Sequence, residues 1–358
     1  MPLFMDIHIV EDGAFNEIAA REGHREDLAV QDKYGVRNIK YFLNLSEKKI
    51  FCLMEAADKK ACVDMHLSAH GIGACNVIEV SSEIDFNAFF GEGSKDENDM
   101  ALTSSGEIDT GYRTLMMVSL IDFSGNNGKH LDEIRRLIRQ YQGSNINQPN
   151  DYITTSFIHA SDAIACCLAV SRWLRSLSLN IDYTMALVTG KPVDEVGSEF
   201  FGEAQERLQM LCRLGGNRTV HIDTDTKALL QIDFNKSDAE NGMVKLVSNG
   251  DFNLFETLWK TLEFQISNAD FKSEDLNKTL GLSKAQAYRK IKALTGMSPN
   301  VLIREMRLRR SLEALKENNK TVAEIAYELG FNSPTYFTRV FRNRYKELPT
   351  TFAKLHSA

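Results

Sequence analysis

The chain has 358 residues, of which 43% are hydrophobic and 25% are charged. That length predicts two or three domains with real cores and excludes a chain that is disordered throughout. No uncharged apolar run approaches the roughly 20 residues that a membrane helix needs. The first residues (MPLFMDIHIVED) have no basic start and no long apolar stretch, so we do not expect them to be a signal peptide. Six cysteines without a CxxC pair are not expected to form a disulfide framework. We therefore expect a cytoplasmic protein with no membrane partner.

Charge is unevenly distributed along the chain. From Phe252 to the end there are 18 Lys or Arg and 11 Asp or Glu, whereas the preceding part has 24 basic and 38 acidic residues. A basic C-terminal region that follows an acidic N-terminal part predicts that the C-terminal region binds a polyanion. Two segments rich in Gly, Ser and acidic residues, 91–111 and 235–251, are predicted linkers. They divide the chain into domains 1–90, 112–234 and 252–358.

Residues 1–90 alternate strand and helix patterns. The expected elements, in chain order, are a strand at 4–10, a helix at 16–34, strands at 39–45 and 49–54, a helix at 59–70 and a strand at 76–80. Gly71 follows the second helix, where glycine is a common C-cap residue. The order β-α-β-β-α-β predicts a ferredoxin-like domain.

Four of the eight histidines lie in this domain. His66 and His70 are four residues apart on the second helix, so both rings can reach one point. His8 alternates with two isoleucines on the first strand, and His24 lies on the first helix. Imidazole clusters suit nickel, zinc, copper or cobalt, and affinity alone does not choose among these metals. The alternative is that His66 and His70 are surface residues and His8 a core residue. Candidate additional ligands are Asp6, Asp27 and Glu55.

Two short segments of this domain, Lys33–Val36 and Phe51–Ala56, resemble a small ferredoxin-like family described as nickel-binding. The predicted metal ligands, His8, His24, His66 and His70, rest on the chemistry of the imidazoles, and the resemblance makes nickel a candidate metal. Cys52, Cys62 and Cys75 are interpreted as small apolar residues rather than ligands. The adjacent pair Cys166 and Cys167 is interpreted as core, with a redox switch as the minority alternative.

Residues 112–234 again show a two-layer α/β pattern. Strands are expected at 114–121, 152–157, 180–188 and 219–222, and helices at 131–142 and 160–177. The segment Leu115–Gly125, residues 150–157, 161–163, Gly190 and the Phe201-Gly202 pair resemble class III adenylate/guanylate cyclase domains. In that family two aspartates bind two metal ions that activate the ribose hydroxyl and hold the triphosphate.

The resemblance implies that the cyclase machinery is incomplete. The first metal-binding Asp position falls on Ser119, and the second falls on Asp151, a vestigial metal position. The transition-state Asn and Arg fall near Glu206 and Met210, neither of which can substitute for them. We therefore expect a degenerate cyclase-like domain that is not an enzyme. Whether it binds a nucleotide is left open.

The C-terminal region contains an internal repeat with an offset of 50 residues. Ser283, Arg289, Lys292 and Pro299 recur as Ser333, Arg339, Arg342 and Pro349. Capping boxes are expected at Ser283–Gln286 and Thr321–Glu324. Each copy is a helix, a Gly-containing turn and a second helix, which is the helix-turn-helix pattern. An unbroken amphipathic segment, 298–317, joins the copies and spans roughly 30 Å, close to one turn of B-DNA.

The segment Ile325–Arg342 resembles the signature of the AraC/XylS family of transcription regulators, and the resemblance covers about 100 residues. One departure is Lys346, where the family commonly has glycine; Gly296 occupies the equivalent position in the first copy. Ala353 is a second departure, because a basic residue is common there. The resemblance implies an all-α double helix-turn-helix domain that binds double-stranded DNA.

The second helix of each copy supplies the candidate DNA contacts. Gln can pair bidentately with adenine and Arg with guanine, whereas Ala and Thr can touch a thymine methyl. The predicted base-reading residues are Ala285, Gln286, Tyr288, Arg289, Pro334, Thr335, Thr338 and Arg339. The predicted phosphate contacts are Lys284, Lys290, Lys292, Arg342 and Arg344. The alternative is a solvated basic helix face.

The fold class is thus multidomain α+β, with two ferredoxin-like or cyclase-like α/β sandwich domains before the all-α domain. The favoured function is a sequence-specific DNA-binding transcription regulator controlled by a metal or small-molecule effector. The alternatives are a nucleotide cyclase fused to a DNA-binding domain and a metal-storage protein. We expect a homodimer, because cyclase-like domains pair and paired DNA sites favour two-fold assembly. RNA polymerase is a further candidate partner.

Overall fold

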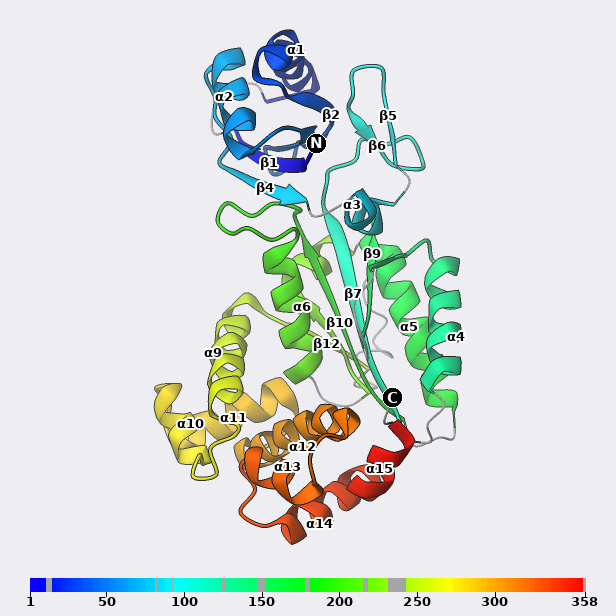
Figure 1. Cartoon of the computed structure of the whole chain (residues 1–358), viewed down its shortest axis with the longest axis vertical. Coiled ribbons are helices and arrows are strands. Elements are labelled where there is room, and N and C mark those ends of the chain that lie inside the picture. Colours follow the sequence, from blue (N-terminus) through cyan, green and yellow to red (C-terminus); the bar gives the residue numbers. More distant parts are fainter. Residues whose placement is uncertain are drawn as a thin grey trace.

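The computed structural model describes residues 1–10, 15–80, 83–91, 93–123, 127–146, 152–177, 181–214, 218–230 and 243–356. Figure 1 shows a four-stranded sheet with two helices at one end of the long axis, a six-stranded sheet in the centre and a helical C-terminal part at the other end. The predicted α+β fold class with an all-α C-terminal region is confirmed. None of the helices in these ranges is long and apolar enough to cross a membrane.

The N-terminal sheet has the antiparallel strand order β2-β3-β1-β4, as a ferredoxin-like domain requires. Asn16 caps the first helix by accepting a hydrogen bond from the Ala19 N–H, and Asp58 caps the second through the Ala61 N–H. Alternation along the first strand turns Phe4 toward the helices, whereas Met5 lies in a core that continues into the central sheet. The elements are β1 (Leu3–Ile9), α1 (Glu17–Tyr34), β2 (Arg37–Asn44), β3 (Lys49–Glu55), α2 (Lys59–His70) and β4 (Asn76–Val80).

The segment 91–111 differs from the expected linker. It contains β5 (Ser94–Lys95) and β6 (Ala101–Leu102), and its backbone pairs with β2. The Tyr41 N–H donates to the Asp99 carbonyl at 3.0 Å, and the Leu43 N–H donates to the Asp109 carbonyl at 3.1 Å. The segment therefore satisfies backbone groups at an edge of the N-terminal sheet that water would otherwise solvate.

The end of the predicted first domain packs with the middle of the chain. Helix α3 (Glu83–Phe90) carries Phe89, whose ring stacks on Phe201 with centroids 4.8 Å apart. The hydroxyl of Ser156 donates to the Phe89 carbonyl at 2.6 Å. Helix α3 thus lies against the central sheet.

The central sheet has the order β12-β11-β10-β7-β9-β8, in which β11 and β12 run parallel to β10 and the other neighbours are antiparallel. Met116 and Val118 face the core shared with α4 and α5, whereas Leu115 and Met117 face α6. Helices of the same chain therefore cover both faces. The elements are β7 (Arg113–Asp122), α4 (Asn127–Gln140), β8 (Ser144–Ile146), β9 (Tyr152–Phe157), α5 (Ala160–Ser176), β10 (Ile181–Gly190), α6 (Gly202–Leu214), β11 (Val220–Asp223), α7 (Thr224–Leu229) and β12 (Val244–Val247).

Helix α6, which covers one face of the central sheet, was not foreseen from the sequence. Within the predicted linker 235–251, the sequence offers a short strand candidate at Met243–Val247, and Val244–Val247 forms β12 at the sheet edge. Residues 235–242 lie outside the described residues. Cys166 and Cys167 are both buried on α5, consistent with a core position.

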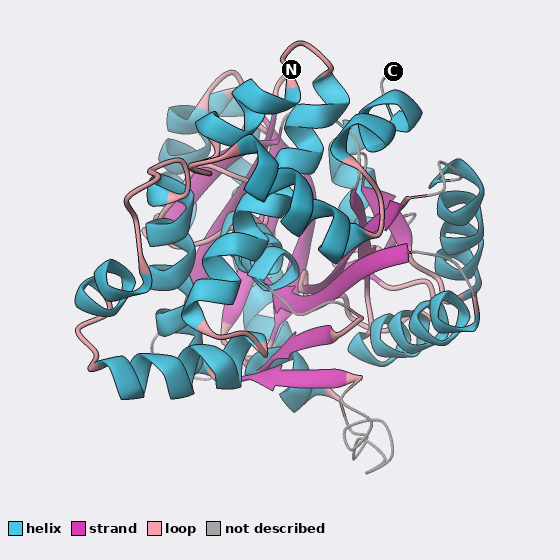
Figure 2. Cartoon of the chain, turned by 90° about the horizontal axis from the view of Figure 1, so that it is seen from below, coloured by secondary structure: helices cyan, strands magenta, loops and turns pink. Residues whose placement is uncertain are grey.

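The secondary structure of the C-terminal region is helical, and its helices lie beyond one end of the central strands (Figure 1), so that helices stand in front of the strands in the view from below (Figure 2). Both predicted capping boxes are present, at Ser283–Gln286 and at Thr321–Glu324. Gly296 and Lys346 end the two second helices with φ of 76° and 63°, so the non-glycine residue adopts the same left-handed turn. The helices are α9 (Asn249–Gln265), α10 (Ser273–Thr279), α11 (Lys284–Thr295), α12 (Pro299–Glu317), α13 (Val322–Glu328), α14 (Pro334–Tyr345) and α15 (Pro349–His356).

Candidate metal centre and nucleic-acid interface

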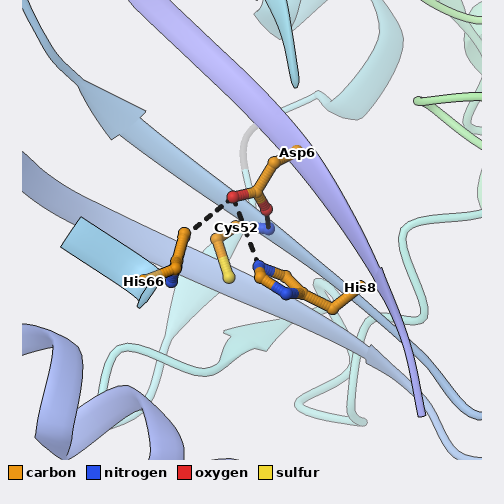
Figure 3. A group of neighbouring side chains, drawn as sticks. All are labelled: Asp6, His8, Cys52 and His66. Carbon is orange, nitrogen blue, oxygen red and sulfur yellow. Dashed lines mark hydrogen bonds and ion pairs between the residues drawn. The ribbon is translucent and has the colours of Figure 1, made fainter. Parts of the chain in front are cut away.

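Four side chains that can bind metal converge on the helix-covered face of the N-terminal sheet (Figure 3). Asp6 and His8 alternate along β1 and so point to the same side, Cys52 comes from β3, and His66 comes from α2. The Nε2 atom of His66 lies 2.8 Å from Oδ2 of Asp6, and Nε2 of His8 lies 3.3 Å from the same oxygen. All four ligand atoms, including the Cys52 sulfur, lie within 4.8 Å of one another, and all four residues are buried. We call this group the Asp6 cluster.

Three polar atoms of the Asp6 cluster lack hydrogen-bond partners among the described residues. Oδ2 of Asp6 and the Nε2 atoms of His8 and His66 are buried, and their short separations do not have hydrogen-bond geometry. Buried polar atoms in this state are rare because they have lost water without replacement. A single cation bound among them would satisfy all three. A carboxylate, two imidazoles and a thiol suit nickel, zinc, cobalt or copper, so the residues fit a divalent transition metal.

Electrostatic interactions in the cluster favour the protonated form of His66 and the ionised form of Asp6. Burial opposes protonation of His66, but the charge of Asp6 and a hydrogen bond with Asp27 raise the pKa of His66 to about 10. Burial likewise opposes ionisation of Asp6, but His8 and His66 hold the pKa of that carboxyl well below its usual range. Burial, reinforced by Asp6, raises the pKa of the Cys52 thiol. Metal binding would therefore displace protons from His66 and Cys52.

A second group shares the His66 ring. Nδ1 of His66 lies 2.9 Å from Oδ1 of Asp27 on α1, and Nε2 of His70 lies 3.3 Å from the same oxygen. A carboxylate on the far nitrogen of a ligating imidazole fixes the ring orientation and its tautomer. Asp27 thus orients His66. His70 contacts Asp27, and this carboxylate lies between His70 and the His66 ring.

His24 lies apart from both groups. Its Nε2 atom is 3.4 Å from Oδ2 of Asp99 in the β5–β6 turn, and its ring packs against Tyr41 with centroids 4.7 Å apart. Of the four predicted metal histidines, the structure brings His8 and His66 together, adds His70 at the edge and leaves His24 on the hairpin side. Glu55, a candidate addition, is ion-paired with Arg37 at 2.8 Å instead.

Cys52 is the member of the cluster that sequence reasoning missed. Its backbone N–H donates to Oδ1 of Asp6 at 3.0 Å across the β1–β3 pair, which places the two side chains side by side. Asp6 and His8 share a face by local alternation, a signal that the sequence contains. The position of Cys52 depends on strand register, which a single sequence does not specify.

The predicted base-reading residues lie on the exposed sides of α11 and α14. Ala285, Gln286, Tyr288, Arg289, Thr335 and Arg339 are exposed, and Pro334 and Thr338 are half-buried. The Arg339 guanidinium lies 5.3 Å from the Tyr336 ring centroid, and the Lys292 ammonium lies 3.5 Å from the Tyr288 hydroxyl. Gln286 also caps its own helix, because its Oε1 accepts the Ser283 N–H at 3.0 Å.

The predicted phosphate contacts divide into two groups. Lys284, Lys290, Lys292 and Arg342 are exposed. Arg344 is directed inward and contacts Glu305 and Asp182, with Nη2 2.5 Å from Oδ2 of Asp182 and 2.8 Å from Oε1 of Glu305. Its expected phosphate contact is therefore corrected, since two carboxylates already occupy the guanidinium.

A single rigid helix separates the two repeats. Helix α12 has 19 residues, which corresponds to about 28 Å at 1.5 Å per residue. Arg307 on this helix donates to the Ile266 carbonyl at 2.9 Å and the Asn268 carbonyl at 2.6 Å, which ties the rod to the end of α9. The rod length approaches the separation of successive major grooves on one DNA face.

The positions that the cyclase resemblance singled out and the structure describes, Ser119, Glu206 and Met210, do not line one common pocket. Ser119 on β7 lines a cavity with residues of β10, α9 and α12, whereas Glu206 and Met210 on α6 line a separate groove with residues of α9. Asp151, the vestigial metal position, lies outside the described residues.

Two family models match parts of the chain. Residues 4–80 match a family described as nickel responsive protein SCO4226-like, and residues 276–355 match a helix-turn-helix domain. Among curated relatives, histidine kinase P4 of Formosa agariphila is 32% identical over 111 residues, which cover 31% of this chain and 8% of the kinase. The HTH-type transcriptional regulator MtrA of Neisseria gonorrhoeae is 33% identical over 73 residues, covering 20% of this chain and 24% of MtrA. The chain thus spans a quarter or less of either relative.

Solved structures align with separate domains. SCO4226 from Streptomyces coelicolor is 27% identical and covers 23% of this chain and 98% of its own, with a TM-score of 0.21. The guanylyl cyclase domain of the RhoGC fusion protein from Blastocladiella emersonii is 11% identical and covers 34% of this chain and 83% of its own, with a TM-score of 0.29. The two family matches cover the N-terminal sheet domain and the C-terminal helices described above. The chain carries an AraC-type helix-turn-helix domain at its C-terminal end and a domain similar to nickel-responsive proteins at its N-terminal end.

Proposed function

We propose that the protein is a cytoplasmic, sequence-specific transcription regulator whose binding to double-stranded DNA is controlled by a divalent metal. The observation that carries the proposal is the pair of exposed helices, α11 and α14, on two repeats joined by one continuous helix. Each presents an arginine, Arg289 or Arg339, at the same repeat position. Arginine reads guanine bidentately in the major groove, so each repeat has the side chain for one half-site.

Nickel is the favoured metal, with zinc, copper and cobalt as the other candidates, and the Asp6 cluster is its proposed site. The metal ligands would be Asp6, His8, Cys52 and His66. A short path of contacts leads from this site to the middle domain, between the metal site and the DNA-binding region. Ile7, between two of these ligands, pairs with Asn76 on β4, and the Asn76 amide donates to the Asp194 and Gly197 carbonyls at 2.8 and 3.0 Å.

We propose that the middle domain links the metal site to the DNA-binding region and forms the dimer interface, and that it does not catalyse a reaction. Mg²⁺ prefers carboxylate and phosphate oxygens, and Ser119 offers a neutral hydroxyl at the first metal position. Met210 is buried and has no proton to donate to a developing phosphate charge. We further propose a homodimer. Because helices cover both faces of the central sheet, its interface would use helical surfaces rather than an open sheet face. RNA polymerase remains a proposed partner on DNA.

Selection from random duplex DNA with the full-length protein tests the DNA-binding proposal. We expect enrichment of a motif with two half-sites about 10–10.5 base pairs apart, the spacing of successive major grooves. Binding that is salt-sensitive but enriches no sequence would overturn it, because phosphate contacts alone give that behaviour.

Metal control is tested on the selected duplex in nickel and in chelator. The wild-type protein should change its affinity between the two conditions, and His66→Gln should abolish the difference. His24→Gln is the matched control and should retain it. Equal affinity of the wild-type protein in both conditions would contradict control by nickel.

A further inference from the structure

A cavity of about 190 Å³ lies where the middle domain meets the C-terminal helices. Its walls include Ser119 on β7, Tyr152 on β9, Arg213 on α6, Trp259 on α9 and Arg310 on α12. An apolar cavity of about 150 Å³ takes a benzene ring. The space therefore accommodates one ring with a small substituent, and neither the metal centre nor the DNA-reading surface uses it.

Two aromatic side chains and a guanidinium lie together in the cavity wall. The Arg213 guanidinium lies 5.5 Å from the Tyr152 ring centroid and 5.4 Å from the Trp259 ring centroid. Its Nε atom is buried and has no hydrogen-bond partner among the described residues. Such a group gains free energy when it receives an acceptor, and a planar carboxylate matches the guanidinium fork.

The charge around the cavity favours an anion. The acidic residues at its walls are Asp182, Glu263 and Glu313. Asp182 is already paired with Arg344, and the two glutamates are exposed, so that water and salt screen them. The basic residues at the walls are Arg213, Arg309, Arg310 and Lys316, and Arg309 is itself ion-paired with Glu305. Arg213 and Arg310 are therefore the cations on which the site relies.

Part of the remaining wall is apolar and suits a hydrocarbon ring. Leu262 and Ile266 of α9, Met306 and Leu312 of α12 and Ile121 of β7 supply this surface. Leu262, Ile266 and Leu312 are almost completely buried. The cavity thus combines a ring-sized space that is partly apolar with a guanidinium in its wall.

We propose that this cavity is a binding site for a small aromatic carboxylate. The ring lies between the aromatic side chains and the apolar wall, and the carboxylate accepts hydrogen bonds from Arg213, with Arg310 adding charge at the rim. The ligand contacts both the central sheet and α12, the rod that separates the two repeats. The site is distinct from the metal centre and is independent of whether the chain reads DNA.

Trp259 provides a direct probe of occupancy. The chain has two tryptophans, Trp173 and Trp259, so Trp173→Phe leaves the cavity residue as the only indole. Benzoate is titrated into the full-length Trp173→Phe protein while Trp259 fluorescence is recorded, with benzamide as the neutral isostere and inorganic phosphate as an anion without a ring. We expect a saturable change with benzoate and an affinity at least tenfold weaker for benzamide and for phosphate.

Substitutions at the cationic end locate the site. Arg213→Met should weaken benzoate binding at least tenfold and leave benzamide binding unchanged, and Arg213→Lys should give an intermediate affinity. Arg310→Met, on an exposed residue whose replacement does not disturb packing, should weaken benzoate binding severalfold. Arg135→Met, on the exposed face of α4, is the matched control and should have no effect.

Three results would each overturn the proposal. The first is no saturable fluorescence change with benzoate. The second is equal affinity for benzoate and for benzamide or phosphate, which would indicate a general apolar or anion site. The third is unchanged benzoate affinity in Arg310→Met together with unchanged affinity in any folded Arg213 variant.

Discussion

Arg344 on α14 and Asp182 on β10 form an ion pair between the second repeat and the central sheet, with 2.5 Å between Nη2 and Oδ2. Next to it, the Phe123 ring at the end of β7 stacks on Tyr345 with centroids 4.8 Å apart and meets Phe352 at 5.7 Å. Polar and aromatic contacts therefore hold α14 directly against the central domain that precedes it in the chain.

Removing this guanidinium should destabilise the docked arrangement. Arg344→Met leaves the carboxylates of Glu305 and Asp182 without their shared cation, and we expect a loss of about 3 kcal/mol in the free energy of unfolding. Asp182→Asn should lose only about 1 kcal/mol, because the amide oxygen still accepts a hydrogen bond. Urea unfolding measures both. Arg342→Met, on an exposed neighbour, is the control; an equal loss there would contradict the role of the pair.

Equivalent glycines of the two repeats should differ in their tolerance of alanine. Gly281 and Gly330 both have positive φ, 62° and 75°. A Cβ at Gly281 would meet nothing within 4 Å, whereas one at Gly330 would lie 2.9 Å from both the Ile266 carbonyl oxygen and an Arg307 nitrogen. Gly281→Ala should therefore lose about 1 kcal/mol from backbone strain alone. Gly330→Ala should lose clearly more in the same unfolding measurement, and equal losses would show that the close approach is unimportant.

Stability at acidic pH should depend on one buried histidine. Burial, with the charge of Lys245, lowers the pKa of His221 on β11 to about 3, whereas an unfolded histidine titrates near 6.5. Between these values the unfolded chain holds one more proton, so the stability that His221 contributes above pH 6.5 is lost as the pH falls. In His221→Gln the free energy of unfolding should fall less steeply between pH 6 and 4, by about 1.4 kcal/mol per pH unit.

The control for that experiment is His159→Gln, on an exposed residue before α5. It should leave the slope of the wild-type protein unchanged. A wild-type slope in His221→Gln would show that the buried ring does not account for the loss.

Metal content should separate the four N-terminal histidines. His8→Ala combined with His66→Ala removes both imidazoles of the Asp6 cluster, so bound nickel should disappear from the dialysed protein in elemental analysis. His24→Ala should keep the wild-type metal content, because His24 faces Asp99 instead. Loss of metal in His24→Ala with retention in the double variant would reverse the assignment.

Much of the fold followed from local patterns. The capping boxes at Ser283 and Thr321 and the repeat itself are signals contained within a few residues, and all appear where the sequence placed them. The β5–β6 hairpin was missed because its composition is polar and its turn is held by Asp96, whose Oδ1 accepts the Asn98 and Met100 N–H groups. Such a turn is difficult to distinguish from a linker by composition.

In the candidate sites, too, local patterns predicted some residues, whereas others depend on contacts between distant parts of the chain. His8 and His66 were foreseeable from strand alternation and helix spacing, whereas Cys52 joins them only through the pairing of β1 with β3. Arg344 has the position of a surface cation within its repeat, yet its partner Asp182 lies 162 residues earlier in the chain. Contacts of that kind depend on how domains dock, which no local pattern specifies.

The most direct test of the central claim is the affinity of Arg289→Ala and Arg339→Ala for the selected duplex and for variants with single base-pair changes. Each substitution should lose about 1–3 kcal/mol and relax the preference at one base pair within its own half-site. Lys292→Ala, the phosphate-contact control, should weaken binding to all sequences alike and reduce the salt slope by about one. If both arginine variants weaken specific and random duplexes equally and relax no base pair, α11 and α14 do not read the sequence.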